Sequence, residues 1–124
     1  MTKGEKVSES EWLLRRVYRH DRKHTDRTTG LPNSRAFAPR PKDEGKLSVN
    51  IKSLSSYLES IVAERNFRLF MFSASVVYKL KLSCIYDPLP DNNAHALVSG
   101  FDSEDESAPG IIARSAKEVF STNF

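Results

Sequence analysis

Apolar positions in this chain fall into short segments separated by polar turns. Residues 47–51 (LSVNI) alternate apolar and polar side chains, which predicts a strand with one buried face. Residues 67–72 (FRLFMF) are apolar on both faces apart from Arg68, as in a central strand. Residues 82–86 and 94–99 are two further apolar runs, and the Pro, Asp and Asn residues between them predict a hairpin.

Three other segments show helical spacing. We expect a helix from a cap at Ser53 to about Arg65, with its apolar stripe formed by Leu54, Leu58, Ile61 and Val62. A second helix is expected over residues 74–80, after a cap at Ser73. Ser107 and Pro109 open a third, whose stripe is formed by Ile112, Ala116, Val119 and Phe120.

Residues 12–18 (WLLRRVY) fit two structures. Ser8 and Glu11 form a capping-box signature, which favours a helix that starts here. A short strand fits equally well, with Leu14 opposing Arg15. We favour the strand, because the polar residues that follow give a helix no apolar face to continue.

Residues 19–46 form a long polar stretch that is interrupted by glycine and proline. A loop of this length is usually functional or disordered. Phe37 is its one large apolar residue and is expected to pin the loop to the core. We therefore predict a flexible N-terminus at residues 1–10 and a single α+β domain over residues 11–124. Its sheet would be mixed or antiparallel, with roughly four to five strands and two to three helices largely on one face.

Composition places the chain among small single domains. It has 124 residues and one cysteine, Cys84, so an intramolecular disulfide and a four-cysteine metal site are excluded. Cys84 lies in an expected strand, where a buried apolar role is favoured over a reactive thiol. The N-terminal residues lack the apolar core of a signal peptide, and no apolar run is long enough for a membrane span. We expect a cytoplasmic protein that does not contact membranes.

Charge is distributed unevenly around a net value of +3. Residues 15–46 hold ten basic and four acidic side chains, a net charge of +6, whereas residues 87–124 hold two and seven, a net charge of −5. The basic side chains suited to contact phosphates are Arg15, Arg16, Arg19, Arg22, Lys23, Arg27, Arg35 and Arg40. Tyr18 and Phe37 are candidates for stacking on bases. The alternative is a globule with two oppositely charged, solvated surfaces.

Histidine supplies the candidate chemistry. His20 and His24 have the i, i+4 spacing of metal ligands on a helix, but the basic residues around them would repel a dication, so we expect no metal or cofactor. His95 is the candidate general acid or base, with Asp87 and Asp91 close in sequence. Its alternative role is structural, in a turn whose aspartates accept backbone hydrogen bonds. Ser34 is a weaker candidate nucleophile, since it has no base nearby and fits a turn.

Four segments follow one another along the chain: LLRRV, NSRAF, KLSVNIKSL and LSCIYDPLPDNNAHALVSG. Together they resemble a family of small, mostly uncharacterised bacterial proteins with the pattern LYRR…SSAAF…LSV…SL…DPLPDNPAHALI and a C-terminal helix. The resemblance covers most of the chain after residue 11 and implies a bacterial, stand-alone domain. The family has no established activity, so no catalytic role is carried over. This chain departs from the pattern at Asn93 and Arg35.

The family pattern selects positions to test for convergence in space: Arg15 or Arg16, Ser34, Ser48, Asp87, Asp91 and His95. Two functions follow from the sequence. The first is an accessory or interaction module that binds a protein partner, in a bacterial defence or mobile-element context. It predicts no cleft around His95 and an exposed edge strand or apolar patch. The alternative is a nucleic-acid-binding or RNA/DNA-cleaving protein, which predicts that Arg19, Arg22, Arg35 and His95 share one concave face. A small-ligand site, such as one for ADP-ribose, is a third and more distant option.

Overall fold

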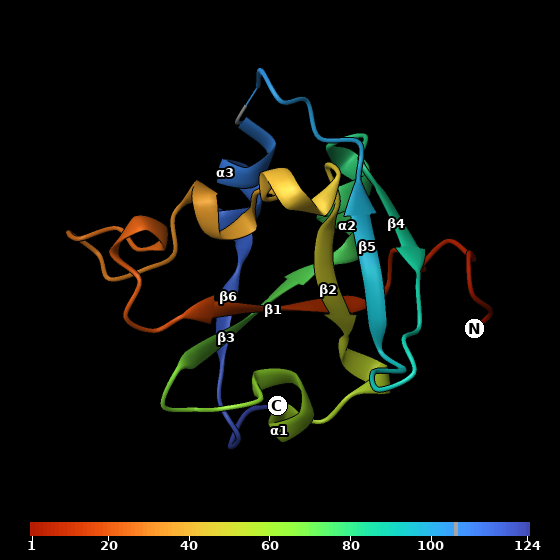
Figure 1. Cartoon of the computed structure of the whole chain (residues 1–124), viewed down its shortest axis with the longest axis horizontal. Helices are drawn as coiled ribbons and strands as arrows, with labels where there is room; N and C mark the ends of the chain where they lie inside the picture. Colours follow the sequence, from red (N-terminus) through yellow and green to blue (C-terminus); the bar gives the residue numbers. More distant parts are fainter. Residues whose placement is uncertain (106) are drawn as a thin grey trace.

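Six strands pair into one antiparallel sheet in the order β4-β5-β2-β1-β3-β6, as the computed structural model of residues 1–105 and 107–124 shows (Figure 1). The strands are β1 (Trp12–Tyr18), β2 (Leu47–Ile51), β3 (Phe67–Ser73), β4 (Ser83–Tyr86), β5 (His95–Ser99) and β6 (Lys117–Val119). Every pairing is antiparallel, including the expected β4–β5 hairpin. The α+β fold class is confirmed, and segment 12–18 is the strand that the pattern favoured.

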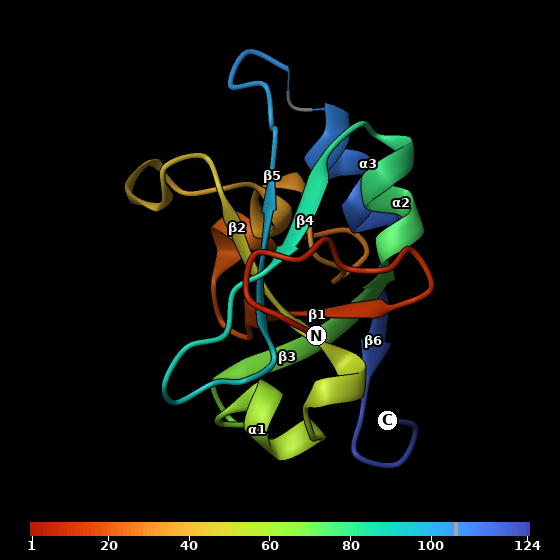
Figure 2. The ribbon, with the colours of Figure 1, turned by 90° about the vertical axis from the view of Figure 1, so that its right-hand side faces the viewer.

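Helices cover both faces of this sheet. They are α1 (Tyr57–Ile61), α2 (Ala74–Lys79) and α3 (Ser107–Ser115), and the 3-10 turns are Arg22–His24, Ser34–Phe37, Pro41–Asp43 and Lys52–Leu54. α2 and α3 lie together on one side, whereas α1 lies apart from them (Figure 2). None of the helices in the described part of the chain has the length and apolar character needed to cross a bilayer.

Two apolar clusters form the core. The larger lies under α2 and α3 and includes Leu13, Phe72 and Ile112. The smaller lies under α1 and includes Leu14 and Ile61. Leu13 and Leu14 are adjacent in β1 and point to opposite faces, so β1 is buried on both sides. This two-sided burial explains why its apolar pattern did not distinguish a strand from a helix.

α1 is shorter than the sequence pattern predicts and buries a different face. It begins after Ser56, whose hydroxyl accepts from the Glu59 N–H at 3.2 Å, while the Glu59 carboxylate accepts from the Ser56 N–H at 3.1 Å. It ends at Ile61, and the next residue, Val62, has a φ of 67°. Tyr57 and Ile61 are buried, but Leu58 is 68% exposed. The cap expected at Ser53 is therefore wrong.

β6 replaces the second half of the predicted C-terminal helix. α3 ends at Ser115, and Val119 then pairs with Leu69 of β3 and is buried beneath α1. Phe120, expected on the apolar stripe, is 50% exposed. Burial of a β-branched residue on the sheet thus prevails over the helical spacing.

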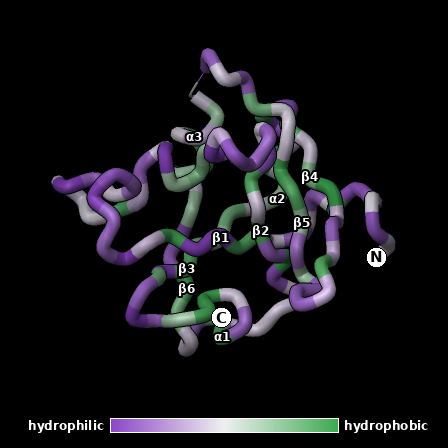
Figure 3. Tube along the Cα trace, in the orientation of Figure 1, coloured by the Kyte–Doolittle hydropathy of each residue, from purple (hydrophilic) through white to green (hydrophobic). Residues whose placement is uncertain are grey.

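Parts of the two segments that were expected to be flexible or irregular are held to the sheet. Residues 4–7 run along β4, where the Val7 N–H donates to the Cys84 carbonyl at 2.9 Å and Val7 is fully buried. The stretch 19–46 is largely hydrophilic (Figure 3). Phe37 anchors it as expected, since its ring is buried and packs edge-on against Phe72 with centroids 5.7 Å apart.

Candidate functional site

The sheet opens between β1 and β2. These strands pair only at Leu13–Ile51 and Leu14–Asn50, whereas β1 stays paired with β3 up to Tyr18. β2 likewise stays paired with β5 up to Leu47. Beyond Leu14 and Asn50 the two central strands diverge (Figure 1) and are not paired, and we call this unpaired stretch between them the opening.

Arg15 occupies this opening. Its Nη1 donates to the Ser48 carbonyl at 2.9 Å, and its Nε donates to the Ala36 carbonyl at 3.2 Å. Burial, with repulsion from Arg40 as a smaller cause, lowers the pKa of Arg15 to about 10, so the side chain is still charged at neutral pH. Among the described residues, no carboxylate forms an ion pair with Arg15. The opening thus holds a partly buried positive charge whose recorded partners are neutral carbonyls.

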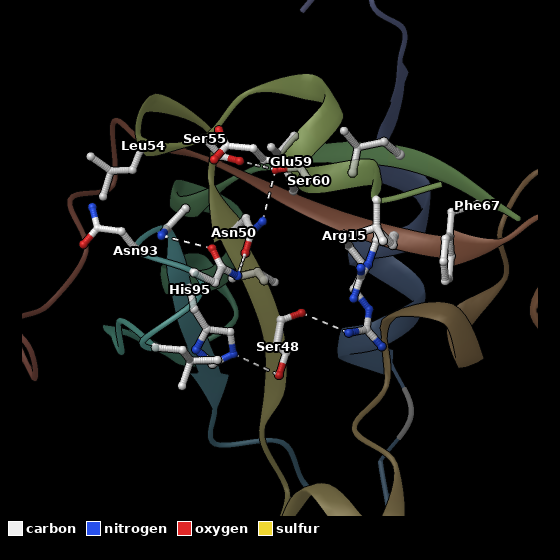
Figure 4. Close-up of a pocket in the computed structure, with 18 of the residues that line it drawn as sticks. Arg15, Ser48, Asn50, Leu54, Ser55, Glu59, Ser60, Phe67, Asn93 and His95 are labelled. Atoms are coloured by element: carbon white, nitrogen blue, oxygen red, sulfur yellow. Dashed lines mark hydrogen bonds between the residues drawn. The ribbon is translucent and has the colours of Figure 1, made fainter. Parts of the chain in front are cut away.

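A groove of about 650 Å³ runs beside this opening (Figure 4). Ser48, Asn50 and His95 give it a polar floor, on the face of the sheet that carries α1. Arg15, Arg16 and Arg40 line it as well. Two carboxylates, Glu59 and Asp91, and the exposed apolar side chains of Leu54, Val62 and Leu89 complete its rim.

His95 is fixed by contacts at both ring nitrogens. Its Nδ1 lies 2.8 Å from the Asp87 carbonyl oxygen and 3.2 Å from Asp87 Oδ2. Both atoms only accept hydrogen bonds when the carboxylate is ionised, so Nδ1 carries the hydrogen. Nε2 lies 3.2 Å from Ser48 Oγ, and in the neutral ring it accepts from that hydroxyl. His95 is thus oriented by the main chain and carboxylate of Asp87 and faces Ser48.

The turn at residues 87–94 is held to the floor of the groove by amide side chains. Asn92 Nδ2 donates to Asn50 Oδ1 at 2.8 Å, and Asn50 Nδ2 donates to Ser60 Oγ at 3.1 Å (Figure 4). On the other side of the turn, the Tyr86 hydroxyl donates to the Asn93 carbonyl at 2.6 Å. This network joins β2, α1 and the turn, and it places His95 at a fixed point of the groove.

Aromatic side chains flank the arginine side of the groove. The rings of Tyr18 and Phe67 lie with centroids 5.0 Å apart, and the Arg16 guanidinium lies 5.0 Å from the Phe67 centroid. Both rings line the groove, and Tyr18 is 48% exposed. They provide surfaces on which a planar ligand can stack.

Some of the sequence candidates converge and others do not. Arg15, Arg16, Arg40, Asp91 and His95 line the groove, and Asp87 lies directly behind His95. Arg35 lines a smaller hollow that shares Arg15, Arg16 and Arg40 with the groove.

The remaining candidates lie elsewhere. Arg19 donates to the carbonyls of Glu64 and Phe67. Arg22, Lys23 and Arg27 are exposed and do not line the groove. Ser34 begins the turn that packs against α3, and Phe37 is fully buried, so its ring has no free face for a base.

The family pattern selected Ser48 as a position to test, without a chemical role, and the sequence did not select Asn50 or Phe67 as site residues. The alternation in residues 47–51 does place Ser48 and Asn50 together on the polar face of β2. The alternation does not show which strand pairs with β2. The pairing with β5, in which Asn50 lies opposite His95, brings the polar face of β2 next to the imidazole.

No metal centre is evident in the described residues. Within them, no three or more His, Cys, Asp and Glu side chains are grouped so that they could hold a metal ion. His24 Nδ1 instead lies 3.3 Å from Asp21 Oδ2.

Comparisons with known proteins give no match to a family model, a curated protein or a solved structure. The resemblance to a family of small bacterial proteins therefore stays a prediction, and the function rests on the groove itself.

Proposed function

We propose that the groove binds single-stranded nucleic acid and that His95 acts there as a general acid or base on a phosphodiester. The main support for this proposal is the positive charge of Arg15. Among the described residues Arg15 has no carboxylate partner, and it lines the same groove as His95. A guanidinium in such a place favours a phosphate oxygen as its partner.

The other arginines extend this site along the groove. Arg16 is exposed, and Arg40 pairs with Asp43 at 3.0 Å but still lines the wall. Phosphates would follow this side, and Tyr18 and Phe67 would stack on bases. Glu59 and Asp91 would accept hydrogen bonds from exocyclic amino groups rather than approach phosphates.

Binding is tested by the fluorescence anisotropy of labelled single-stranded RNA and DNA oligonucleotides at increasing salt. We expect the Kd to rise with salt, and Arg16→Ala and Arg40→Ala to weaken binding. Arg22→Ala is the matched control, because it removes the same charge from the basic segment outside the groove. Absence of binding at low salt would overturn the proposal. Equal effects of Arg22→Ala and Arg16→Ala on the Kd would show that binding depends on diffuse positive charge and not on the groove.

A second candidate is the interaction module that binds a protein partner in a bacterial defence or mobile-element context. Leu54, Leu58 and Val62 favour it, because all three are exposed on the segment that forms the rim of the groove. Such an apolar patch is typical of protein interfaces. It would be tested by co-purification with Leu58→Ser/Val62→Ser, with Phe120→Ser as the control. A partner that is retained by the double variant would exclude this patch.

Under both proposals we place the protein in the cytoplasm. The single buried cysteine supports this location, because it needs no oxidising compartment.

A further inference from the structure

We infer that Ser48 is a nucleophile, activated by His95 and poised for attack on a phosphorus centre. This inference rests on the proposed function, because it specifies how the nucleic-acid groove would act on a bound phosphodiester. It assigns a chemical role to a strand residue that the sequence selected for a test of convergence but explained no further than as the polar side of an amphipathic strand.

Ser48, His95 and Asp87 lie in the order of a Ser–His–Asp arrangement, but the hydrogen bond of Nδ1 goes to the main chain of Asp87 and its carboxylate lies within ion-pair distance. Ser48 Oγ lies 3.2 Å from His95 Nε2, and His95 Nδ1 lies 3.2 Å from Asp87 Oδ2. The hydrogen bond of Nδ1 is made to the Asp87 carbonyl at 2.8 Å, and this bond fixes the tautomer. Nε2 is therefore the free base, and it faces the hydroxyl whose proton it would take.

The proposed nucleophile is more accessible to solvent than the proposed base, as a ligand that enters from the groove requires. Ser48 is exposed, whereas the His95 side chain is only 12% exposed. Ser48 and His95 both line the groove, so the hydroxyl is reachable from it. A ligand in the groove would thus meet Ser48 first, with the imidazole behind it and shielded from water. Asp87 does not line the groove and acts as a positioning residue.

Arginine, rather than backbone N–H groups, is available to stabilise the developing negative charge. Arg15 donates through Nη1 to the main chain of Ser48 itself, which ties its charge to the nucleophile. No hydrogen bond among the described residues uses its Nη2. A planar guanidinium matches the paired non-bridging oxygens of a phosphoryl group, whereas the single oxyanion of an acyl intermediate is usually held by amide N–H groups. The site therefore favours phosphoryl over acyl transfer.

The reaction step balances without a further reactant. Ser48 Oγ forms a bond to phosphorus, its proton passes to His95 Nε2, and the P–O bond to the leaving nucleoside oxygen breaks as that oxygen takes the proton from the imidazolium. Water then attacks the phosphoserine diester and its proton passes to His95. The bond from phosphorus to Ser48 Oγ breaks as Oγ takes that proton from the imidazolium, which restores the hydroxyl and the neutral imidazole. The product strands are a free hydroxyl end and a phosphate end.

The test uses a fluorophosphonate probe on the full chain, with peptide mapping by mass spectrometry. In this step Ser48 Oγ bonds to the probe phosphorus, fluoride leaves and the proton passes to His95. We expect labelling at Ser48, its loss in Ser48→Ala, and unchanged labelling in Ser83→Ala, which removes an exposed strand serine from β4. His95→Gln should slow labelling on the order of 100-fold, the contribution of a general base. Asp87→Asn should also slow it while leaving the Kd for RNA unchanged, which separates positioning from a change in the groove.

Labelling of the unmodified chain that is spread over other serines, or that is absent from Ser48, would overturn the inference. This outcome does not depend on whether the His95→Gln variant folds. An unchanged labelling rate in folded His95→Gln would overturn the role of the base. Failure of the proposed function is distinguishable from failure of this inference. In the first case RNA and DNA do not bind, but Ser48 is still labelled by the probe. Hydrolysis of a carboxylic ester substrate, with no cleavage of a phosphodiester, would overturn the phosphoryl class.

Discussion

Arg15 Nη1 lies 2.9 Å from the carbonyl oxygen of Ser48, on the side of β2 from which β1 has diverged. A side chain thus takes the place that a backbone N–H of the neighbouring strand would fill in a continuous sheet. The same guanidinium donates to the Ala36 carbonyl, so it links β2 to the long basic segment. Arg15 is therefore both a ligand candidate and the structural substitute for a missing strand contact.

The first prediction concerns the stability that Arg15 provides. Arg15→Leu removes the donors to the Ser48 and Ala36 carbonyls and should lower the free energy of unfolding by about 1.5–3 kcal/mol, the usual range for a hydrogen bond to a charged group. Urea denaturation measures this change. Arg16→Leu is the control, because Arg16 is exposed and contacts the Phe67 ring; it should change stability by less than about 0.5 kcal/mol. Equal effects of the two variants would contradict the structural role of Arg15.

The second prediction identifies the true cap of α1. Ser56→Ala removes the acceptor of the Glu59 N–H and should cost about 1 kcal/mol. Ser53→Ala, at the cap expected from the sequence, should cost less, because the Ser53 hydroxyl donates to the Glu11 carboxylate and not to a group of the helix. Thermal unfolding of the two variants gives the comparison, and a larger loss for Ser53→Ala would contradict the observed helix start.

The helix start also illustrates what the sequence can and cannot predict. Strand alternation in residues 47–51 and the hairpin at residues 82–99 depend on local spacing, and both were predicted. The bounds of α1 and β6 depend on which of their residues pack against the sheet. Ile61 and Val119 belong to the same apolar cluster as Leu14 and Leu69 of the sheet. In each case helical spacing was present in the sequence, and tertiary packing prevailed over it.

The candidate site shows the same division. His95, Asp87 and the arginines were chosen by residue type, and of these His95, Arg15, Arg16 and Arg40 line the groove. The family pattern selected Ser48 and His95 as positions that could converge, but local spacing could not predict their contact, because the two lie 47 positions apart and meet through the register of β2 with β5. Arg19 failed as a groove residue for a similar reason, since its guanidinium is held by main-chain carbonyls far along the chain.

The third prediction concerns the attachment of β6. Arg68 and Glu118 form a two-point ion pair across β3 and β6, with distances of 3.0 and 2.9 Å, and this bond raises the pKa of Arg68. Glu118→Gln should lower the free energy of unfolding by about 1 kcal/mol and speed hydrogen exchange in residues 117–119. Lys117→Gln, an exposed neighbour in the same strand, should do neither. Unaltered exchange in Glu118→Gln would show that apolar packing of Val119 alone holds β6.

The last prediction is a loss of stability at alkaline pH. Burial raises the pKa of the Cys84 thiol from 9.0 to about 12, and burial raises the pKa of Tyr78 from 10.0 to about 12. The two groups meet where residues 4–7 run along β4, since the Tyr78 hydroxyl donates to the carbonyls of Val7 and Cys84. Both groups stay neutral in the folded state over a range in which the unfolded chain ionises.

The sign follows from linkage: the stabilising contribution is fully present below the unfolded pKa and declines as the pH rises from about 9 to about 12. Urea denaturation at several pH values should show the free energy of unfolding falling by up to about 1.4 kcal/mol per pH unit for each group in that window. Cys84→Ala should make the fall shallower, because only Tyr78 then contributes, and a thiol reagent should react with Cys84 at the rate of unfolding. A slope that is identical in Cys84→Ala and the unmodified chain would show that the buried thiol does not contribute to the alkaline transition.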